Sequence, residues 1–222
     1  MSYPYLKPTS STNKVVYSFK TVILFFILSL LSCINKSDHE CKSINGFIKD
    51  IPVVHNKLPL GYVYALQISD QMNLSDISNG YDSLQIRVWF PTEKDGSHLL
   101  LILERTANKW NMKAYKYLAD YTNQIPEIIS YKKISAQPKN SWEVIINAVD
   151  QIKILEVKDF RQIENYDYNS THPAHYDFEV ATCSSYRYFE IPDPEKNRSV
   201  PEAKKVLEFV ILLKSEIEYY LF

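Results

Sequence analysis

Glycine and cysteine are scarce in this sequence, and neither sign of charge dominates it. Only 4 of its 222 residues are glycine and it contains no short-period repeat, which argues against collagen-like, β-helical and propeller arrays. A formal net charge of -1 lacks the basic excess that is typical of nucleic-acid-binding proteins. With 45% hydrophobic and 23% charged residues, the chain can bury enough apolar surface to fold. These absences leave a globular protein that is not expected to bind nucleic acid.

Short motifs of common enzyme classes are also missing. The sequence has no Gly-x-Ser-x-Gly elbow, no P-loop, no Gly-x-Gly-x-x-Gly pattern and no His-Glu-x-x-His motif. It has 3 cysteines and no Cys-x-x-Cys pair, so zinc-ribbon and thioredoxin-like proteins are excluded for want of ligands or nucleophile. No cofactor is therefore expected, and binding is favoured over catalysis.

The N-terminus has the pattern of an export signal. Residues 1–20 contain Lys7, Lys14 and Lys20 and no acidic residue, and an apolar run follows from Val22 to Leu31. A positive segment before a short apolar run and a small residue is typical of a secretory signal. The run is too short for a membrane-spanning helix, which needs about 20 residues.

The stretch Leu30-Leu31-Ser32-Cys33 resembles the lipobox of bacterial lipoproteins. In those proteins the cysteine is acylated and becomes the first residue of the mature chain, so the resemblance implies a lipid on Cys33 that anchors the protein in a membrane. Two other interpretations stay open: an uncleaved signal anchor that starts near Val15, and an ordinary cleavable signal followed by a chance cysteine. The lipoprotein is favoured, in the bacterial cell envelope and at the outer membrane rather than the inner one.

On this basis the chain divides into three parts. Residues 1–32 are the expected signal peptide, residues 33–50 the lipidated Cys33 with a flexible polar tether, and residues 51–222 a single domain. Loss of the signal-peptide lysines leaves 22 basic and 26 acidic residues, so the mature protein is acidic. Export would permit a disulfide between Cys41 and Cys183, and the sequence alone leaves that pairing open.

Hydrophobic periodicity predicts an α+β domain. Apolar and polar residues alternate over 83–90, and a continuous apolar run at 99–103 indicates a strand that is buried on both faces. Further strands are expected over 62–68, 110–118, 128–134, 176–182 and 186–191. Helical spacing predicts two main helices, at about 141–153 and 200–220. We therefore expect an antiparallel sheet of about five to seven strands, including a meander, with both helices on one face.

Three stretches between residues 80 and 220 carry a family resemblance. They are Ile86-Arg87-Val88-Trp89-Phe90, the Ser141-Trp142 helix start, and the Tyr186-Arg187-Tyr188 strand with its proline-containing exit into a Glu-Ala-Lys helix. Together they are similar to uncharacterised lipoproteins common in Bacteroidota-type bacteria. The resemblance implies the same location and fold. It brings no known activity and therefore implies no catalytic residue.

One cluster has metal-ligand character. His172 and His175 are followed by Asp177 and Glu179. In an extended strand the last three side chains share one face, and imidazole with carboxylate can hold zinc or a similar cation that activates water. The plainer interpretation is a polar, solvent-facing strand whose other face packs in the core. A third is a histidine pair that senses pH.

Two surfaces are candidates for binding. Arg87 and Trp89 are expected on an exposed strand face, and such a pair suits a protein interface or an anionic ligand. Tyr186 and Tyr188, with Arg187 between them, suggest an aromatic platform like those of sugar-binding modules. For both surfaces the plainer interpretation is structural: Trp89 lies under a helix, Arg87 forms a local salt bridge, and the tyrosines pair across strands.

The leading functional hypothesis is a lipid-anchored envelope domain that acts by binding or by structural interaction with a protein partner. One alternative is a metal-dependent hydrolase built on His172 and His175. The other is an immunity or inhibitor lipoprotein whose acidic surface neutralises a basic toxin.

Overall fold

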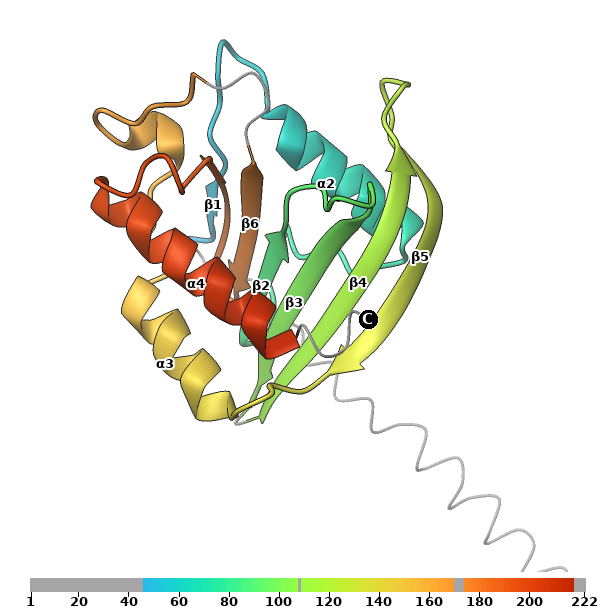
Figure 1. Ribbon diagram of the computed structural model, residues 1–222, viewed down its shortest axis with the longest axis vertical. Helices are drawn as coiled ribbons and strands as arrows, with labels where there is room; N and C mark the ends of the chain where they lie inside the picture. Colours follow the sequence, from blue (N-terminus) through green and yellow to red (C-terminus); the bar gives the residue numbers. More distant parts are fainter. Residues whose placement is uncertain (1–45, 108, 170–173, 218–222) are drawn as a thin grey trace, which may run out of the picture. The chain divides into compact units, whose positions relative to one another are not determined.

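The computed structural model describes residues 46–107, 109–169 and 174–217, which form one seven-stranded sheet with three α-helices (Figure 1). The expected α+β class is confirmed. The sheet is mixed, however, and mostly rather than purely antiparallel. The predicted signal peptide, Cys33, His172 and most of the tether lie outside the described residues.

A central meander accounts for most of the sheet. The strands are β1 (Ile48–Asp50), β2 (Leu84–Trp89), β3 (His98–Thr106), β4 (Lys109–Asp120), β5 (Glu127–Ala136), β6 (His175–Thr182) and β7 (Ser185–Pro192), in the spatial order β1-β7-β6-β2-β3-β4-β5. Strands β2 to β5 form the expected antiparallel meander, and the β6–β7 hairpin adds to the free side of β2. The short β1 pairs with β7 in parallel, which makes the sheet mixed. Strand β2 therefore lies well inside the sheet, between β3 and β6.

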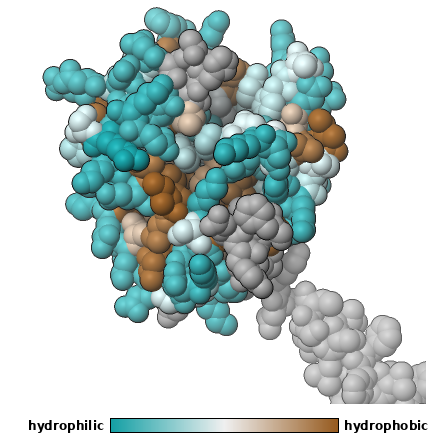
Figure 2. All heavy atoms as spheres, in the orientation of Figure 1, coloured by the Kyte–Doolittle hydropathy of each residue, from teal (hydrophilic) through white to brown (hydrophobic). Residues whose placement is uncertain are grey.

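Both predicted helices are confirmed, and they cover the same face of the sheet. Helices α3 (Trp142–Ile152) and α4 (Pro201–Ile217) lie side by side across this face (Figure 1). Their buried residues recur at helical spacing, as in Ile145 and Val149 of α3 and Val206 and Val210 of α4. Figure 2 views the same face, which is largely hydrophilic, with hydrophobic side chains gathered over the middle of α4 and the adjoining part of α3.

The third helix, α2 (Leu60–Gln71), covers the opposite face of the sheet (Figure 1). The strand expected over 62–68 is therefore wrong. The residues that α2 buries, Tyr62, Ala65 and Ile68, are three apart, whereas Leu66 is 36% exposed. The true period is thus that of a helix, and the alternation of apolar residues over 62–68 is coincidental.

The two faces of the sheet bury different kinds of side chain. On β2, Ile86 and Val88 point into the apolar core under α3 and α4, and both are fully buried. Gln85, Arg87 and Trp89 point the other way and are also buried, because α2 lies over them. The α2 face of the sheet is therefore an interior built largely from aromatic and polar side chains.

One cysteine of the described residues takes part in a disulfide. Cys183, in the turn between β6 and β7, is disulfide-bonded. The other two cysteines, Cys33 and Cys41, lie outside the described residues, so the pairing of Cys41 with Cys183 stays a prediction. Strand β1 starts nearby, since the backbone nitrogen of Ile48 donates to the carbonyl of Ser184 at 3.0 Å.

Substitution Cys183→Ser is expected to lower the free energy of unfolding by about 2–4 kcal/mol, because the bond closes a long loop and restricts the unfolded chain. Denaturant titration of the full-length protein, with and without dithiothreitol, measures this. Reduced wild type should match the variant, and the variant should not respond to reductant. Equal stability of oxidised wild type and Cys183→Ser would contradict the prediction.

Candidate functional site

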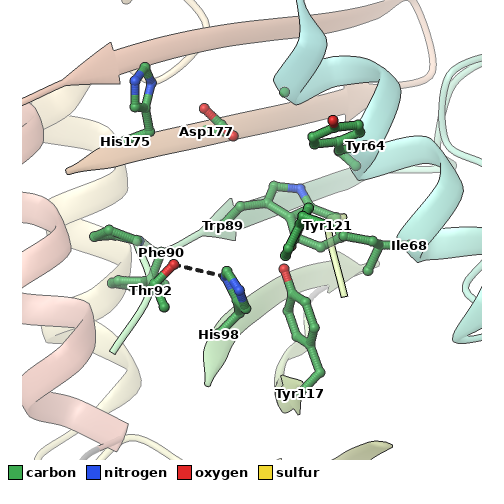
Figure 3. Close-up of a pocket in the computed structure, with 13 residues that line it drawn as sticks. Tyr64, Ile68, Trp89, Phe90, Thr92, His98, Tyr117, Tyr121, His175 and Asp177 are labelled. Carbon is green, nitrogen blue, oxygen red and sulfur yellow. Dashed lines mark hydrogen bonds between the residues drawn. The ribbon is translucent and has the colours of Figure 1, made fainter. Parts of the chain in front are cut away.

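A pocket lies between α2 and the sheet, at the end where β2 leaves the sheet and β6 enters it. Its volume is about 330 Å³. Figure 3 shows the side chains that surround it, which come from α2, β2, β3, β4, β6 and the loops after β2 and β4. Five of the lining side chains are aromatic rings: Tyr64, Trp89, Phe90, Tyr117 and Tyr121. A pocket of this size, lined by rings and a few polar groups, is typical of a small-ligand site.

The rings of the pocket contact one another at steep angles. Trp89 and Tyr117 meet edge to face, with ring centroids 6.2 Å apart and an interplanar angle of 86°. Tyr64 from α2 lies against Tyr121 from the loop after β4, with centroids 5.6 Å apart and an angle of 51°. The His98 imidazole stacks on Tyr117 at 5.0 Å. The rings thus enclose a space from several directions instead of forming one flat platform.

Asp177 is the only acidic side chain among the described residues that line the pocket, and sheet register explains its position. It stands opposite Trp89 on β2 and opposite Glu190 on β7. Its Oδ1 atom is buried and has no hydrogen-bond partner among the described residues. Burial, and next the Glu190 carboxylate, raise the pKa of Asp177 well above its usual range. An orphaned buried carboxyl oxygen beside a pocket is the kind of group that a ligand satisfies.

Gly61 allows α2 to approach this carboxyl group. A Cβ at position 61 would lie 2.5 Å from the Tyr188 hydroxyl, 2.9 Å from Glu190 Oε1 and 3.0 Å from Asp177 Oδ2. Any larger residue would displace the first turn of α2 or the groups beneath it. Two carboxyl groups and a phenol therefore converge on the start of the helix.

Glu190 belongs to a polar cluster beside the pocket. It accepts a hydrogen bond from the Tyr188 hydroxyl at 2.9 Å and is paired with Arg161. Arg161 also pairs with Asp159 at 2.6 Å, and Asp159 Oδ2 accepts from the backbone nitrogen of Glu190 at 2.9 Å. Burial raises the pKa of Glu190, and the Arg161 guanidinium opposes that rise. Glu190 is thus held by partners, in contrast to Asp177.

A second buried network orients Trp89. Glu179 Oε2 accepts from Trp89 Nε1 at 3.0 Å, and Glu179 Oε1 accepts from the Tyr186 hydroxyl at 2.9 Å. Arg87 lies 3.8 Å from Glu179 and donates to Gln85 at 2.9 Å. Because this network is sealed under α2, it positions the indole of the pocket and cannot itself meet a large ligand.

The predicted exposed binding surfaces are corrected by this burial. Arg87 is 2% exposed and Trp89 5% exposed, so the face expected at the surface is covered by α2. Tyr186 and Tyr188 are 0% and 1% exposed and pack with Tyr62 of α2, so they form no open sugar platform. Arg187 points to the other face by the two-residue period of the strand, where it pairs with Asp50 at 2.7 Å.

The predicted metal cluster is only partly brought together. His175, Asp177 and Glu179 do share one face of β6, as the alternation predicts, but burial increases along it: His175 is exposed, Asp177 is half-buried and Glu179 is fully buried. His175 and Asp177 line the pocket, whereas Glu179 is engaged below it. No three His, Cys, Asp or Glu side chains in the described part of the chain are placed to hold a metal ion. His172 lies outside that part.

Several pocket residues were not singled out from the sequence. Tyr64, His98, Tyr117 and Tyr121 come from segments whose aromatic residues indicate only a packed sheet. The one available signal is the density of tyrosine, since the chain has 17 of them. Nothing in the sequence indicates that Gly61 lies against a carboxyl group, because that contact depends on how α2 docks.

The titratable side chains of the lining determine the charge of the pocket. No Lys or Arg lines it. Burial lowers the pKa of both His98 and His175, which favours neutral imidazoles near pH 7. Burial likewise raises the pKa of Tyr117 and Tyr121, so both phenols stay neutral. Within the described lining, therefore, no side chain is expected to be positive near pH 7, and Asp177 is the one acid.

Substitution Asp177→Asn is expected to stabilise the protein at pH 8 by about 1–2 kcal/mol, because an uncompensated carboxylate is no longer buried. The native pKa of Asp177 is raised, so the native state binds more protons than the unfolded state between the two pKa values and stability falls as pH rises. The difference between variant and wild type should therefore shrink as pH falls toward 4. Denaturant titrations at several pH values test this, with Asp70→Asn on the exposed side of α2 as the matched control. A gain that does not depend on pH would count against it.

The class of protein is therefore an α+β domain with an open aromatic pocket between one helix and the sheet. None of its helices, within the residues that the structure describes, is long and apolar enough to span a bilayer. Comparison with family models, curated proteins and solved structures finds no match.

Proposed function

We propose that the protein is an exported, lipid-anchored component of the bacterial cell envelope that binds a small molecule in the pocket beneath α2. The observation that carries the binding function is the aromatic pocket with the orphaned Asp177 Oδ1 atom beside it. Export and anchoring are supported by the lysine-rich start, the short apolar run and the Leu-Leu-Ser-Cys33 stretch. The disulfide at Cys183 also supports export, since such bonds persist in oxidising compartments.

A lipid on Cys33 and a disulfide at Cys183 can occur in the same molecule. If Cys33 carries the lipid, its sulfur is unavailable for a disulfide, and Cys41 is the remaining partner for Cys183. The acyl chains would then hold the protein at the membrane, with a short spacer before the cross-link.

The anchoring part of the proposal is tested by mass spectrometry of the protein from its membrane fraction. The expected mature N-terminus is Cys33 with acyl chains attached, and Cys33→Ser should release the protein from the membrane. A mature chain that starts elsewhere, or membrane association that survives Cys33→Ser, rejects the lipid anchor.

The binding part is tested by a thermal-shift screen of small metabolites on the full-length protein. Thr92 is exposed at the pocket, so Thr92→Trp should narrow the opening and abolish the shift that a bound compound causes. Thr106→Trp, an equally exposed threonine that does not line the pocket, is the matched control and should keep the shift. If no compound gives a shift, or if Thr92→Trp keeps it, the pocket is not the binding site.

A further inference from the structure

We propose that the pocket beneath α2 binds an organic ammonium ion, that is, a quaternary ammonium group or a protonated amine. The inference rests on the proposed binding function and names the ligand class for that site. It is carried by three independent features: the absence of Lys and Arg from the described lining, the aromatic rings around the space, and the oxygen of Asp177 that has no partner among the described residues.

The charge balance of the lining favours a cation over an anion. Phosphate and carboxylate ligands are normally met by Arg, Lys or convergent backbone N–H groups, and no Lys or Arg is among the described residues that line this pocket. The guanidiniums of Arg87 and Arg161 are already engaged, Arg87 by Gln85 and Glu179 and Arg161 by Asp159 and Glu190. A bound anion would therefore find no free cationic partner among the described lining residues.

The aromatic rings supply the attraction that an ammonium ion needs. The face of an aromatic ring carries negative potential, and several rings around one cation form the cage that recognises quaternary ammonium groups. Here Trp89, Tyr117, Tyr64 and Tyr121 line one space at mutual angles of 86° and 51°. Such tilted rings suit a compact, roughly spherical cation better than a flat sugar ring, which stacks on a single plane.

Asp177 supplies the complementary negative charge. Its Oδ1 atom lacks a partner among the described residues, and an ammonium group in the pocket would provide one. Burial, and next the repulsion from Glu190, raise the pKa of Asp177, and a bound cation acts in the opposite direction by favouring the ionised carboxylate. The bound cation would thus compensate for the burial of the Asp177 carboxyl group.

The size of the pocket limits the ligand. A volume of about 330 Å³ is near the lower end for small-molecule sites. It accommodates a choline-sized group and excludes a polymer as the buried part. The same group occurs free in solution and in zwitterionic headgroups, so the test must separate these two sources.

The test is calorimetric titration of the full-length protein in an uncharged detergent. The probes are choline, phosphocholine and 3,3-dimethylbutan-1-ol, which has the shape of choline without its charge. Choline should bind at least about tenfold more tightly than the neutral alcohol. Stronger binding of phosphocholine than of choline assigns a headgroup, and the reverse order assigns the free ion; either supports the inference.

Variants show whether Asp177 provides the selectivity. Asp177→Asn keeps the shape of the side chain and should weaken choline binding about tenfold or more while leaving the neutral alcohol unchanged. Asp70→Asn, on the exposed side of the same helix, should leave choline binding unchanged. Equal affinity for choline and the alcohol, no heat with any ammonium probe at millimolar concentration, or an unchanged Asp177→Asn variant would each overturn the inference.

Failure of this inference is distinguishable from failure of the proposed function. If the ammonium probes fail but a neutral compound from the screen binds and is lost in Thr92→Trp, the pocket is a binding site for another ligand class. If no compound binds, the proposed binding function fails as well.

Discussion

Arg87→Ala is expected to lower the free energy of unfolding by about 3–5 kcal/mol, because it leaves Glu179 as a buried charge without its cation. Arg87 is 2% exposed and Glu179 1% exposed, and they face each other across β2 and β6. The guanidinium also donates to Ser69 Oγ at 3.2 Å and to the Ser75 carbonyl at 2.5 Å. Its loss therefore uncouples α2 and the loop after it from the sheet.

Denaturant titration of wild type, Arg87→Ala, Glu179→Ala and the double variant measures this effect. The double variant should be less destabilised than the sum of the single changes, because it leaves no uncompensated charge. Additive losses would show that the two side chains act independently. Tryptophan fluorescence provides a second readout, since Glu179 holds the Trp89 indole nitrogen at 3.0 Å.

Phe178→Ala is expected to cost about 3–5 kcal/mol by opening a cavity in the apolar core on the other face of the sheet. Phe178 is fully buried and stacks on Phe189, with ring centroids 4.7 Å apart and an interplanar angle of 7°. Both rings lie in the cluster that packs under α3 and α4. The surrounding strands cannot close on the void without breaking sheet hydrogen bonds, so little of the loss should be recovered by relaxation.

The conservative variant Phe178→Leu is the control, and it should cost less than half as much because it leaves most of the volume filled. Stability is measured by denaturant titration at one pH. Phe178 points away from the pocket, so neither variant should change choline affinity at a temperature where both are folded. A small loss for Phe178→Ala would mean that this face contributes less to stability than its burial implies.

The two substitutions probe opposite faces of the same sheet. One face is stabilised by apolar packing, which is non-directional and tolerates shape-conserving changes. The other holds charges and hydroxyls that must all be paired, and a single change leaves a partner orphaned. A site that selects a charged ligand is better placed on the second face, since fixed polar groups there can position an aromatic cage.

The strongest sequence predictions concern segments with one clear period. The strand over 83–90, the apolar run at 99–103 and the helices at 141–153 and 200–220 are all confirmed. The segment 62–68 was misassigned because Tyr and Leu at alternate positions mimic a strand, and only docking against the sheet shows which of them are buried. The apolar pattern predicts a secondary-structure element correctly when all of its apolar residues are buried on one face. It fails in a segment such as 62–68, where some of the apolar residues stay accessible to solvent.

The candidate site was predictable only in part. The residues His175, Asp177 and Glu179 were correctly placed on one face of a strand, and Arg87 with Trp89 on one face of another. The roles of these residues could not be predicted, because they depend on which face of the sheet α2 covers. An Arg and a Trp on an open face suit a partner; under a helix, the same pair becomes a buried network.

By itself the sequence determined the α+β class, most of the strands and both main helices, because these follow from the period of apolar residues along the chain. Tertiary structure alone decided that the polar face of β2 is interior, that Asp177 stands between Trp89 and Glu190, and that Gly61 lets α2 close over them. The physical reason is that strand register and helix docking join residues that lie more than a hundred positions apart in the chain, such as Gly61 and Glu190, and no local period records such contacts.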